Sequence, residues 1–183
     1  MTSEELKTKV SRLQQELQEL KDRLETEAQN LFTTTCTEIF ANYPCLQSFS
    51  WRQYTPYFND GDTCEFSAYT DSIYLNGSED EACTYALERL IGDIQNKDEA
   101  IAQHKKALEK ADPTKWEYRH IQQTIKEIEE TDIETARCML SALQAINELM
   151  ASMSEEVLLG LFGDHARVVV TKDGAEVESY EHD

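Results

Sequence analysis

Aromatic side chains are concentrated in one stretch of the chain, from residue 48 to residue 69, which also contains an Asn-Asp-Gly-Asp turn. Aromatic residues dominate the binding energy of protein interfaces and can also stack on a planar ligand. We predict a binding surface here, completed by two residues of the C-terminal end, because both segments are expected to belong to one small head. The predicted surface consists of Trp51, Tyr54, Tyr57, Phe58, Asn59, Asp60, Asp62, Tyr180 and His182.

Strand alternation distributes these aromatic residues between two faces. Phe49 and Trp51 are two positions apart in a strand-like segment, so they share a face. We assign Trp51 and Phe66 to the core, and Tyr54 and Tyr57 to the surface. The alternative, in which all of them fill the core of a small head, is left open at this stage.

Two groups of polar residues could bind a metal ion. The acidic turn at residues 59–62 has Glu65 nearby, and clustered carboxylates suit Ca²⁺ or Mg²⁺. It lacks the spacing of an EF-hand, so a plain Asn-Asp-Gly turn is the better interpretation. His104 and His120 lie on either side of a predicted turn and could face each other, but no H-x-x-x-H or H-x-H spacing occurs. We predict no metal site and no cofactor.

Sequence patterns typical of enzymes are not found. The chain contains no nucleophile elbow, phosphate loop, H-E-x-x-H or dinucleotide-binding motif. Cys64 lies among acidic residues, without the cations that would stabilise a reactive thiolate. We therefore predict a protein that is not an enzyme and has no catalytic residues.

Charge and cysteine content bear on partners and location. The net charge of -19 opposes contact with nucleic acid or anionic membranes and suits a basic protein partner, although it can also serve solubility alone. The five cysteines are scattered and form no C-x-x-C pair, which predicts free thiols in a reducing compartment. The chain starts without a signal peptide and has no apolar run long enough to span a bilayer. These features predict a cytoplasmic protein.

The elements that position the surface follow from periodicity. Residues 1–43 are predicted to form a coiled-coil helix, which begins with a Thr2-x-x-Glu5 capping box. Its apolar residues recur at alternating steps of four and three, which predicts self-association, with a dimer as the expected state. These residues are Leu6, Val10, Leu13, Leu17, Leu20 and Leu24.

The remainder of the chain alternates between strands and helices. Residues 44–77 have the period-two pattern of strands, and residues 154–183 are predicted to form a short helix and a hairpin around Asp173-Gly174. Residues 78–153 are predicted to form an antiparallel helical hairpin with its turn at Asp112-Pro113. The predicted fold is α+β and mostly helical, with the two β segments joined in one small antiparallel sheet.

Two segments resemble a protein family. The run from Tyr54-Thr55-Pro56-Tyr57-Phe58 through Cys64-Glu65-Phe66 is similar to a segment of uncharacterised proteins of tailed bacteriophages and some bacteria. The end of the chain, from Phe162-Gly163-Asp164-His165 to Tyr180-Glu181-His182-Asp183, resembles the same family. The resemblance covers about a third of the chain and implies a phage or bacterial cytosolic protein, but it implies no activity.

The leading hypothesis is a non-enzymatic, self-associating protein that binds a macromolecular partner through its aromatic and acidic head. If the protein is a phage product, the partner is expected to be a host factor. The alternative is a binder of a small nucleotide-type signal, which the absence of Arg and Lys between residues 59 and 81 opposes. A metal-dependent enzyme is the third hypothesis.

Overall fold

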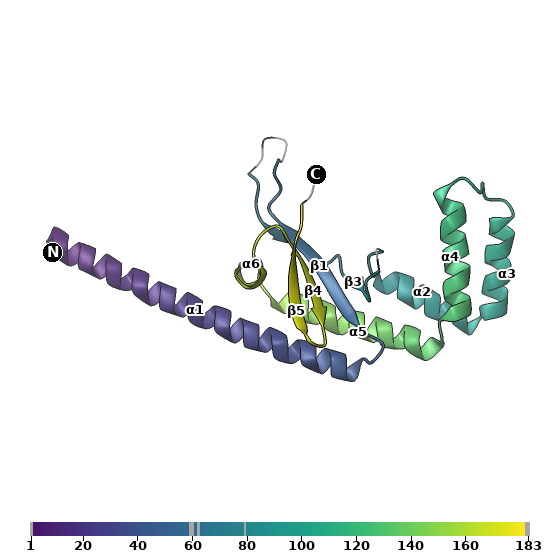
Figure 1. Ribbon diagram of the computed structural model, residues 1–183, viewed down its shortest axis with the longest axis horizontal. Coiled ribbons are helices and arrows are strands. Elements are labelled where there is room, and N and C mark those ends of the chain that lie inside the picture. The colour runs from purple at the N-terminus through teal and green to yellow at the C-terminus, as the bar shows by residue number, and fades with distance from the viewer. Residues whose placement is uncertain (1, 59–60, 62, 79, 182–183) are drawn as a thin grey trace.

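The computed structural model of the protein describes residues 2–58, 61, 63–78 and 80–181. It is an α+β structure, mostly helical, as predicted: a long helix and a helical arm extend from a small antiparallel sheet (Figure 1). The helices are α1 (Ser3–Asn42), α2 (Thr84–Gln95), α3 (Lys97–Leu108), α4 (Trp116–Glu130), α5 (Ile133–Ser152) and α6 (Glu155–Phe162). The strands are β1 (Ser48–Tyr54), β2 (Ser67–Ala68), β3 (Tyr74–Leu75), β4 (Ala166–Thr171) and β5 (Gly174–Ser179).

The sheet joins the two predicted β segments, through strands β1 and β4, which are more than a hundred residues apart in the sequence. Strand β1 pairs with β4 in antiparallel register from Ser48↔Thr171 to Gln53↔Ala166, and β5 extends the sheet beyond β4. On its other edge β1 pairs with β2 at one end and with β3 at the other. The prediction that the two segments meet as neighbouring strands is confirmed.

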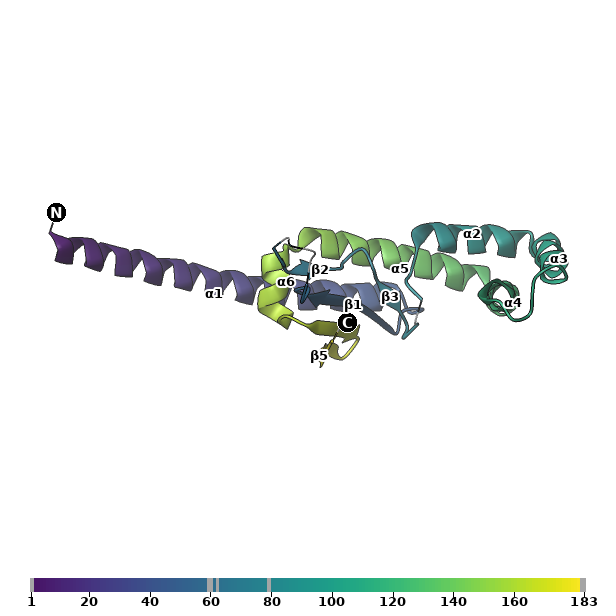
Figure 2. The ribbon, with the colours of Figure 1, turned by 90° about the horizontal axis from the view of Figure 1, so that it is seen from above.

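One face of this sheet carries the core. Helices α1 and α5 run side by side beneath it, and α6 crosses at one end (Figure 2). Phe49 and Trp51 are fully buried on this face, so the assignment of Trp51 to the core is confirmed. The Trp51 ring packs against Phe49, Phe162 and Phe32 of α1, and Phe32 also contacts Phe162. Phe66 is only partly buried at the edge of the same core.

A buried amide attaches α6 to the sheet. Gln53 is fully buried, and its Oε1 accepts a hydrogen bond from Trp51 Nε1 at 3.1 Å. Its Nε2 donates to the carbonyl oxygens of Leu158, within α6, and of Gly163, which caps the C-terminal end of this helix. Carbonyls at a helix end lack partners within the helix, so this one side chain supplies hydrogen bonds where water is excluded.

The first helix has two parts with different surroundings. The predicted capping box is present, since Thr2 Oγ1 accepts from Glu5 N and Thr2 N donates to the Glu5 carboxylate. From Ala28 to Ile39 one side of α1 is buried under the head. The part before Ala28 extends away from the head as a single helix (Figure 1).

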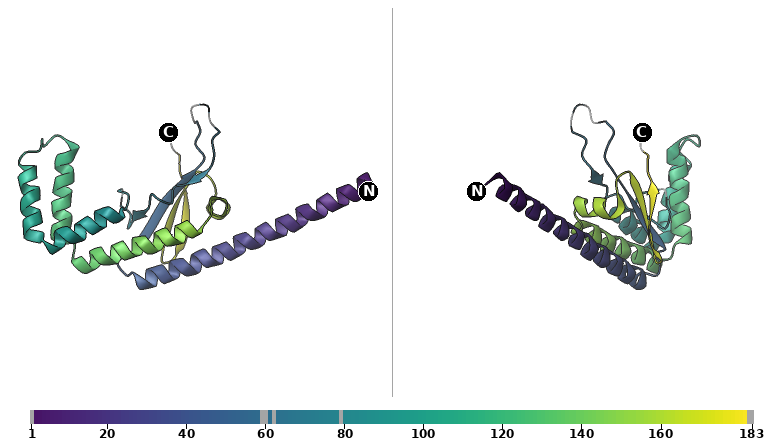
Figure 3. Two further views of the ribbon diagram at one scale, coloured as in Figure 1. Left: turned by 180° about the vertical axis from the view of Figure 1, so that it is seen from behind. Right: turned by 60° about the vertical axis from the view of Figure 1, so that its left-hand side comes forward.

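The region between residues 78 and 153 forms four helices instead of the two predicted. Helix α2 packs on α5 and α3 packs on α4, so the antiparallel hairpin is present but bent (Figure 3). One break lies at Asn96, and the other precedes Asp132, which caps α5 by accepting from Thr135 N. Helix α2 starts after Cys83, five residues beyond the predicted start of the hairpin, and α4 starts after Lys115.

The cysteines differ from the prediction of five free thiols. Cys45, just after α1, and Cys138 of α5 form a disulfide, which the sequence spacing did not indicate because the partners are 93 residues apart. Cys36, Cys64 and Cys83 are free. Burial raises the pKa of the Cys36 thiol to about 12, so that this thiol is unreactive. Disulfides persist mainly in oxidising compartments, so this pair removes the cysteine-based argument for a reducing one.

In the part of the chain that the structure describes, no helix combines the length and the apolar content needed to cross a bilayer. Helix α1 is long enough, but charged and polar residues surround its apolar stripe.

Candidate functional site

The outer face of the sheet carries a small cavity of about 100 Å³. Arg52 and Tyr54 alternate along β1 with the buried Trp51 and Gln53, so they lie on the opposite face. The chain between β2 and β3, the first residue of β3 and the residue after β5 supply the other walls. The cavity, here called the tyrosine pocket, is lined by Arg52, Tyr54, Tyr69, Ser72, Tyr74 and Tyr180.

Arg52 is held between two aromatic rings. Its guanidinium carbon lies 5.1 Å from the ring centre of Tyr74 and 5.0 Å from that of Tyr180, both within cation–π distance. Its Nη1 lies 3.5 Å from the hydroxyl of Tyr180, at the limit of a hydrogen bond. The Nε atom is buried and has no hydrogen-bond partner among the residues that the structure describes.

Arg52 also has no carboxylate within ion-pair distance among the described residues. Arg167 is its direct neighbour across the β1–β4 ladder and offers a comparison. The Nη1 of Arg167 lies 3.2 Å from the Glu178 carboxylate, so that cation is neutralised within the sheet. In a chain of net charge -19, a partly buried guanidinium without such a counterion is conspicuous because buried charges are normally paired.

Tyr54 forms the wall between the pocket and the adjoining loop. Its ring stacks on Tyr69 at 4.7 Å between ring centres and lies 5.5 Å from the ring of Tyr180. A hydrogen bond with the Tyr69 side chain, together with partial burial, raises the pKa of Tyr54, although the nearby Arg52 lowers it. Tyr54 therefore presents a neutral hydroxyl, and the positive charge of Arg52 is not offset by a phenolate.

The loop that follows β1 is attached to the end of α6 and the start of β4. The Asp164 carboxylate accepts hydrogen bonds from the backbone N and the hydroxyl of Thr55, both at 2.8 Å. It also accepts from His165 N at 2.7 Å. The Tyr57 ring stacks on the His165 imidazole at 4.8 Å, while Phe58 is largely exposed. Two large aromatic residues thus stand at the surface beside the pocket.

The hydrogen bonds at Asp164 make this attachment sensitive to acid. Partial burial raises the pKa of the Asp164 carboxyl, but the bonds from Thr55 and His165 lower it by more, to below its usual 3.8. A lowered pKa means that the ionised carboxylate stabilises the fold above about pH 4, and that this contribution is lost as the pH falls through the lowered pKa.

We expect the aromatic ring signals of Tyr57 to shift in NMR spectra as the pH is lowered from 5 to 2. In Asp164→Asn the acidic group is gone, so the shift at low pH should be absent, while the start of the loop is held by fewer hydrogen bonds at all pH values. A titration of Tyr57 that is the same in both proteins would contradict the role given to Asp164.

The structure distributes the predicted surface residues among several places. It brings Tyr54 and Tyr180 together in the pocket, and it leaves Tyr57 and Phe58 exposed beside it. The inclusion of Trp51 was wrong because its side chain lies on the inner face of the sheet. The remaining predicted residues lie outside the described part of the chain: Asn59, Asp60, Asp62 and His182.

Sequence analysis missed four pocket residues: Arg52, Tyr69, Ser72 and Tyr74. The position of Arg52 on the outer face was predictable from the sequence. Side chains alternate along a strand, so burial of Trp51 places the next residue, Arg52, on the opposite face. The positions of Tyr69 and Tyr74 were not predictable, because they depend on how the short strands β2 and β3 pair with β1. Pairing of such short segments has no clear pattern in the sequence.

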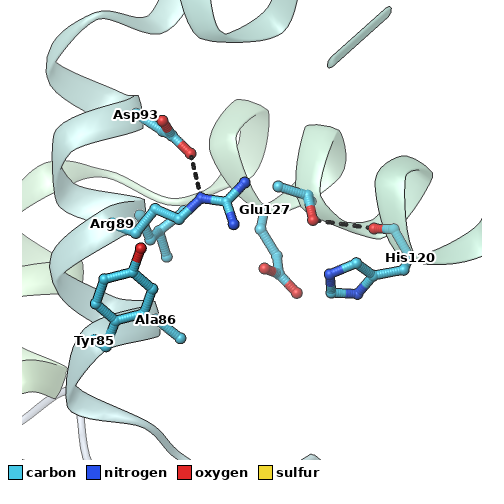
Figure 4. Close-up of a pocket in the computed structure, with 8 residues that line it drawn as sticks. Tyr85, Ala86, Arg89, Asp93, His120 and Glu127 are labelled. Atoms are coloured by element: carbon cyan, nitrogen blue, oxygen red, sulfur yellow. Dashed lines mark hydrogen bonds and ion pairs between the residues drawn. The ribbon is translucent and has the colours of Figure 1, made fainter. Parts of the chain in front are cut away.

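A second cavity, of about 160 Å³, lies between α2 and α4 in the helical arm (Figure 4). Arg89 faces it, but its Nε lies 3.7 Å from the Asp93 carboxylate, which is also 3.7 Å from His104 Nε2. His120 lines the cavity and packs against Trp116, so the two histidines have different neighbours. No convergent group of three or more possible metal ligands is found among the described residues. The tyrosine pocket is the stronger candidate because its cation is not neutralised.

Searches of protein-family models, of curated proteins and of solved structures found no match to the chain. The candidate site therefore has to be interpreted from its own residues.

Proposed function

We propose that this protein is a non-enzymatic binding protein that engages a protein partner through the tyrosine pocket and the adjoining Tyr57 and Phe58. The observation that carries the proposal is the guanidinium of Arg52, held between the rings of Tyr74 and Tyr180 with no carboxylate counterion in the described part of the chain. Such a guanidinium can bind a carboxylate of another molecule.

The chemistry of the pocket supports an acidic side chain or a chain end as the group received. Arginine binds carboxylates through charge-assisted hydrogen bonds, which are stronger than neutral ones. Stacked rings fix the position of the guanidinium before binding, so less conformational entropy is lost on association. The aromatic walls also keep water from competing, and tyrosine and arginine are the residues most enriched at interface hot spots.

The size of the pocket favours a protein partner over a nucleotide. Pockets for small molecules of drug size usually measure about 300–1,000 Å³. The tyrosine pocket measures about 100 Å³, which suits a single side chain inserted from a larger surface. The exposed Tyr57 and Phe58 then provide contact area outside the pocket.

The net charge of the whole chain indicates the charge expected on the rest of the partner's surface. A net charge of -19 favours a partner surface that is basic around the inserted acidic group. We propose a phage or bacterial origin and a host protein as the partner, in line with the resemblance of two segments. The proposal includes action in the cytoplasm, which requires that the head keep its fold when Cys45 and Cys138 are reduced. It also includes self-association through α1.

A nucleotide-type signal remains the second candidate, and one observation favours it. The sequence has no Arg or Lys between residues 59 and 81, but folding brings Arg52 to the tyrosines of this region. A phosphate on Arg52 and a base on Tyr54 would use the same groups. Calorimetric titration with nucleotides distinguishes this candidate from a protein partner.

The proposal is tested by affinity capture from bacterial lysate with three proteins. Wild type is expected to retain a specific partner, and Arg52→Gln is expected to lose it by about tenfold or more, because a charge-assisted contact contributes about 1.5–3 kcal/mol. Arg167→Gln is the matched control, since it removes the same charge from the neighbouring position on the same face. Circular dichroism checks that all three are folded.

Equal capture by wild type and Arg52→Gln would contradict the proposal. Equal loss in Arg52→Gln and Arg167→Gln would mean that general charge, and not the pocket, mediates binding. Loss of capture only in a Tyr57→Ala, Phe58→Ala protein would move the binding surface from the pocket to the loop.

A further inference from the structure

Helix α1 exposes a continuous row of large apolar side chains. Seven of them are between 44% and 59% exposed, although these residue types are usually buried. They are Leu6, Val10, Leu13, Leu17, Leu20, Leu24 and Leu31. We call this row the α1 seam.

The seam is separate from the face of α1 that packs on the head. Leu31 and Phe32 are adjacent, but Leu31 is 58% exposed and Phe32 only 4%. With about 3.6 residues per turn, the seam and the buried face of Phe32, Cys36 and Ile39 are roughly a quarter of a turn apart. The head therefore leaves the seam uncovered along its whole length.

The pattern of the seam is the narrow type that fits a single helix. Apolar residues recur at alternating steps of four and three from Leu6 to Leu24, which places Val10, Leu17 and Leu24 at heptad position a. Leu6, Leu13 and Leu20 occupy position d. A seam of this kind is buried by a partner helix with the same repeat, and a second copy of α1 supplies one.

The charges beside the seam select the orientation of that second copy. In a parallel pair, each g residue faces the e residue five positions later on the partner helix. Glu16 at g then faces Lys21 at e of the second copy, twice by symmetry. The other facing pairs, Lys9 with Gln14 and Arg23 with Ala28, place no like charges together. Glu27, the next d position, would face Glu27 of the second copy, so the paired part of the seam is confined to the six layers from Leu6 to Leu24.

In an antiparallel pair, the six a and d residues from Leu6 to Leu24 can also face one another in six layers, but the flanking charges then repel. In that arrangement g faces g and e faces e, so Lys7 faces Lys21, Lys9 faces Arg23, and Glu16 faces Glu16 of the second copy. Every charged pair is repulsive. Like charges in these positions destabilise by amounts similar to the gain from opposite charges.

An antiparallel pair shifted by one heptad is also disfavoured. Either direction of the shift reduces the apolar layers from six to four. One direction pairs Glu16 with Arg23 but places Glu27 at a d position opposite Val10 of the second copy. The other pairs Lys9 with Glu16 but places Ser3 opposite Leu20 and leaves Leu24 without a facing residue. Burying a carboxylate against an apolar side chain costs several times more than one exposed ion pair contributes. The apolar layers and the flanking charges therefore both favour the parallel, in-register pair.

We infer that two copies of this protein associate through the α1 seam as a parallel, in-register coiled coil. The inference deepens the self-association in the proposed function by naming the partner and its orientation. A parallel dimer holds both heads at the same end, so two tyrosine pockets can bind one multivalent partner with increased avidity. Repulsion between the acidic heads opposes this orientation, but at 0.15 M salt it is screened over about 8 Å.

Cysteine cross-linking tests the orientation directly. In a background with Cys64→Ser and Cys83→Ser, Ser3→Cys alone is expected to form a cross-linked dimer under mild oxidation, because a positions face each other in a parallel pair. In the six-layer antiparallel pair, residue 3 faces residue 27, so only a mixture of Ser3→Cys and Glu27→Cys proteins would form that cross-link.

Charge exchange provides a second, independent test. Glu16→Lys should weaken the dimer about tenfold in sedimentation equilibrium, because two attractive pairs become repulsive. Adding Lys21→Glu to the same chain should restore the affinity. Glu19→Lys is the matched control, since it makes the same charge change at an outward-facing position.

Each outcome decides between the proposals. Cross-linking by Ser3→Cys alone, with restoration by the double charge exchange, supports the parallel dimer. Cross-linking only in the mixture, with no effect of Glu16→Lys, overturns the orientation but leaves self-association intact. A monomer at all concentrations overturns both, while the binding role of the tyrosine pocket, tested separately through Arg52, is unaffected.

Discussion

Replacing Trp51 with alanine is expected to lower the free energy of unfolding by about 3–5 kcal/mol, as is usual for a fully buried aromatic residue. The indole packs against Phe32, Phe49 and Phe162, so its loss leaves a cavity between the sheet and two helices. It also removes the hydrogen-bond donor to the buried Gln53 amide. Urea unfolding monitored by circular dichroism measures the effect.

Tyr57→Ala is the control for this prediction. Its side chain is also aromatic and only a few residues away, but it is 65% exposed, so the expected change in unfolding free energy is within about 0.5 kcal/mol. If Trp51→Ala were as stable as Tyr57→Ala, the inner face of β1 would not be the core. The assignment of the opposite face to the pocket would then fail as well.

Reducing the Cys45–Cys138 disulfide is expected to have an effect of comparable size. The bond closes a loop with a sequence separation of 93 residues, for which the chain-entropy model gives about 4–5 kcal/mol as an upper value. It ties the segment between α1 and β1 to α5, on which α2 packs. Thermal unfolding with and without reductant should show a large decrease in melting temperature.

A Cys64→Ser, Cys83→Ser protein should lose the same stability on reduction, because its disulfide is intact. A Cys45→Ser, Cys138→Ser protein should not respond to reductant, and a response there would contradict the assignment. The free energy of unfolding that is lost on reduction also tests the proposed action in the cytoplasm. A domain is typically stable by about 5–15 kcal/mol, so a head that unfolds on reduction would contradict action in the cytoplasm.

The repeat of the apolar residues was sufficient to predict most of the fold. The steps of four and three in α1, the alternation around Trp51 and the Asp173-Gly174 turn are local patterns, and each matches its element. The breaks at Asn96 and Asp132 were not predicted, because the apolar pattern continues across both. Tertiary packing of α2 on α5 and of α3 on α4 then determines where the helices bend.

The candidate site was only partly predictable. Aromatic content indicated Tyr54 and Tyr180, but the feature that gives the pocket its chemistry is Arg52. Apart from Tyr54 on the same strand, its neighbours in the pocket come from two other segments, residues 69–74 and Tyr180. The positions of Tyr69 and Tyr74 depend on strands of two residues each. The disulfide was missed for a similar reason, since cysteines 93 residues apart meet only after the sheet and α5 are assembled.

The central claim is that Arg52 in the tyrosine pocket receives a carboxylate from a protein partner. A double-mutant cycle tests it most directly: calorimetry of wild type and Arg52→Gln, each titrated with a partner-derived peptide and with the same peptide carrying Glu→Gln or Asp→Asn. We predict that either change alone weakens binding about 10- to 100-fold and that the second change then adds little. Independent, additive effects of the two changes would contradict the claim.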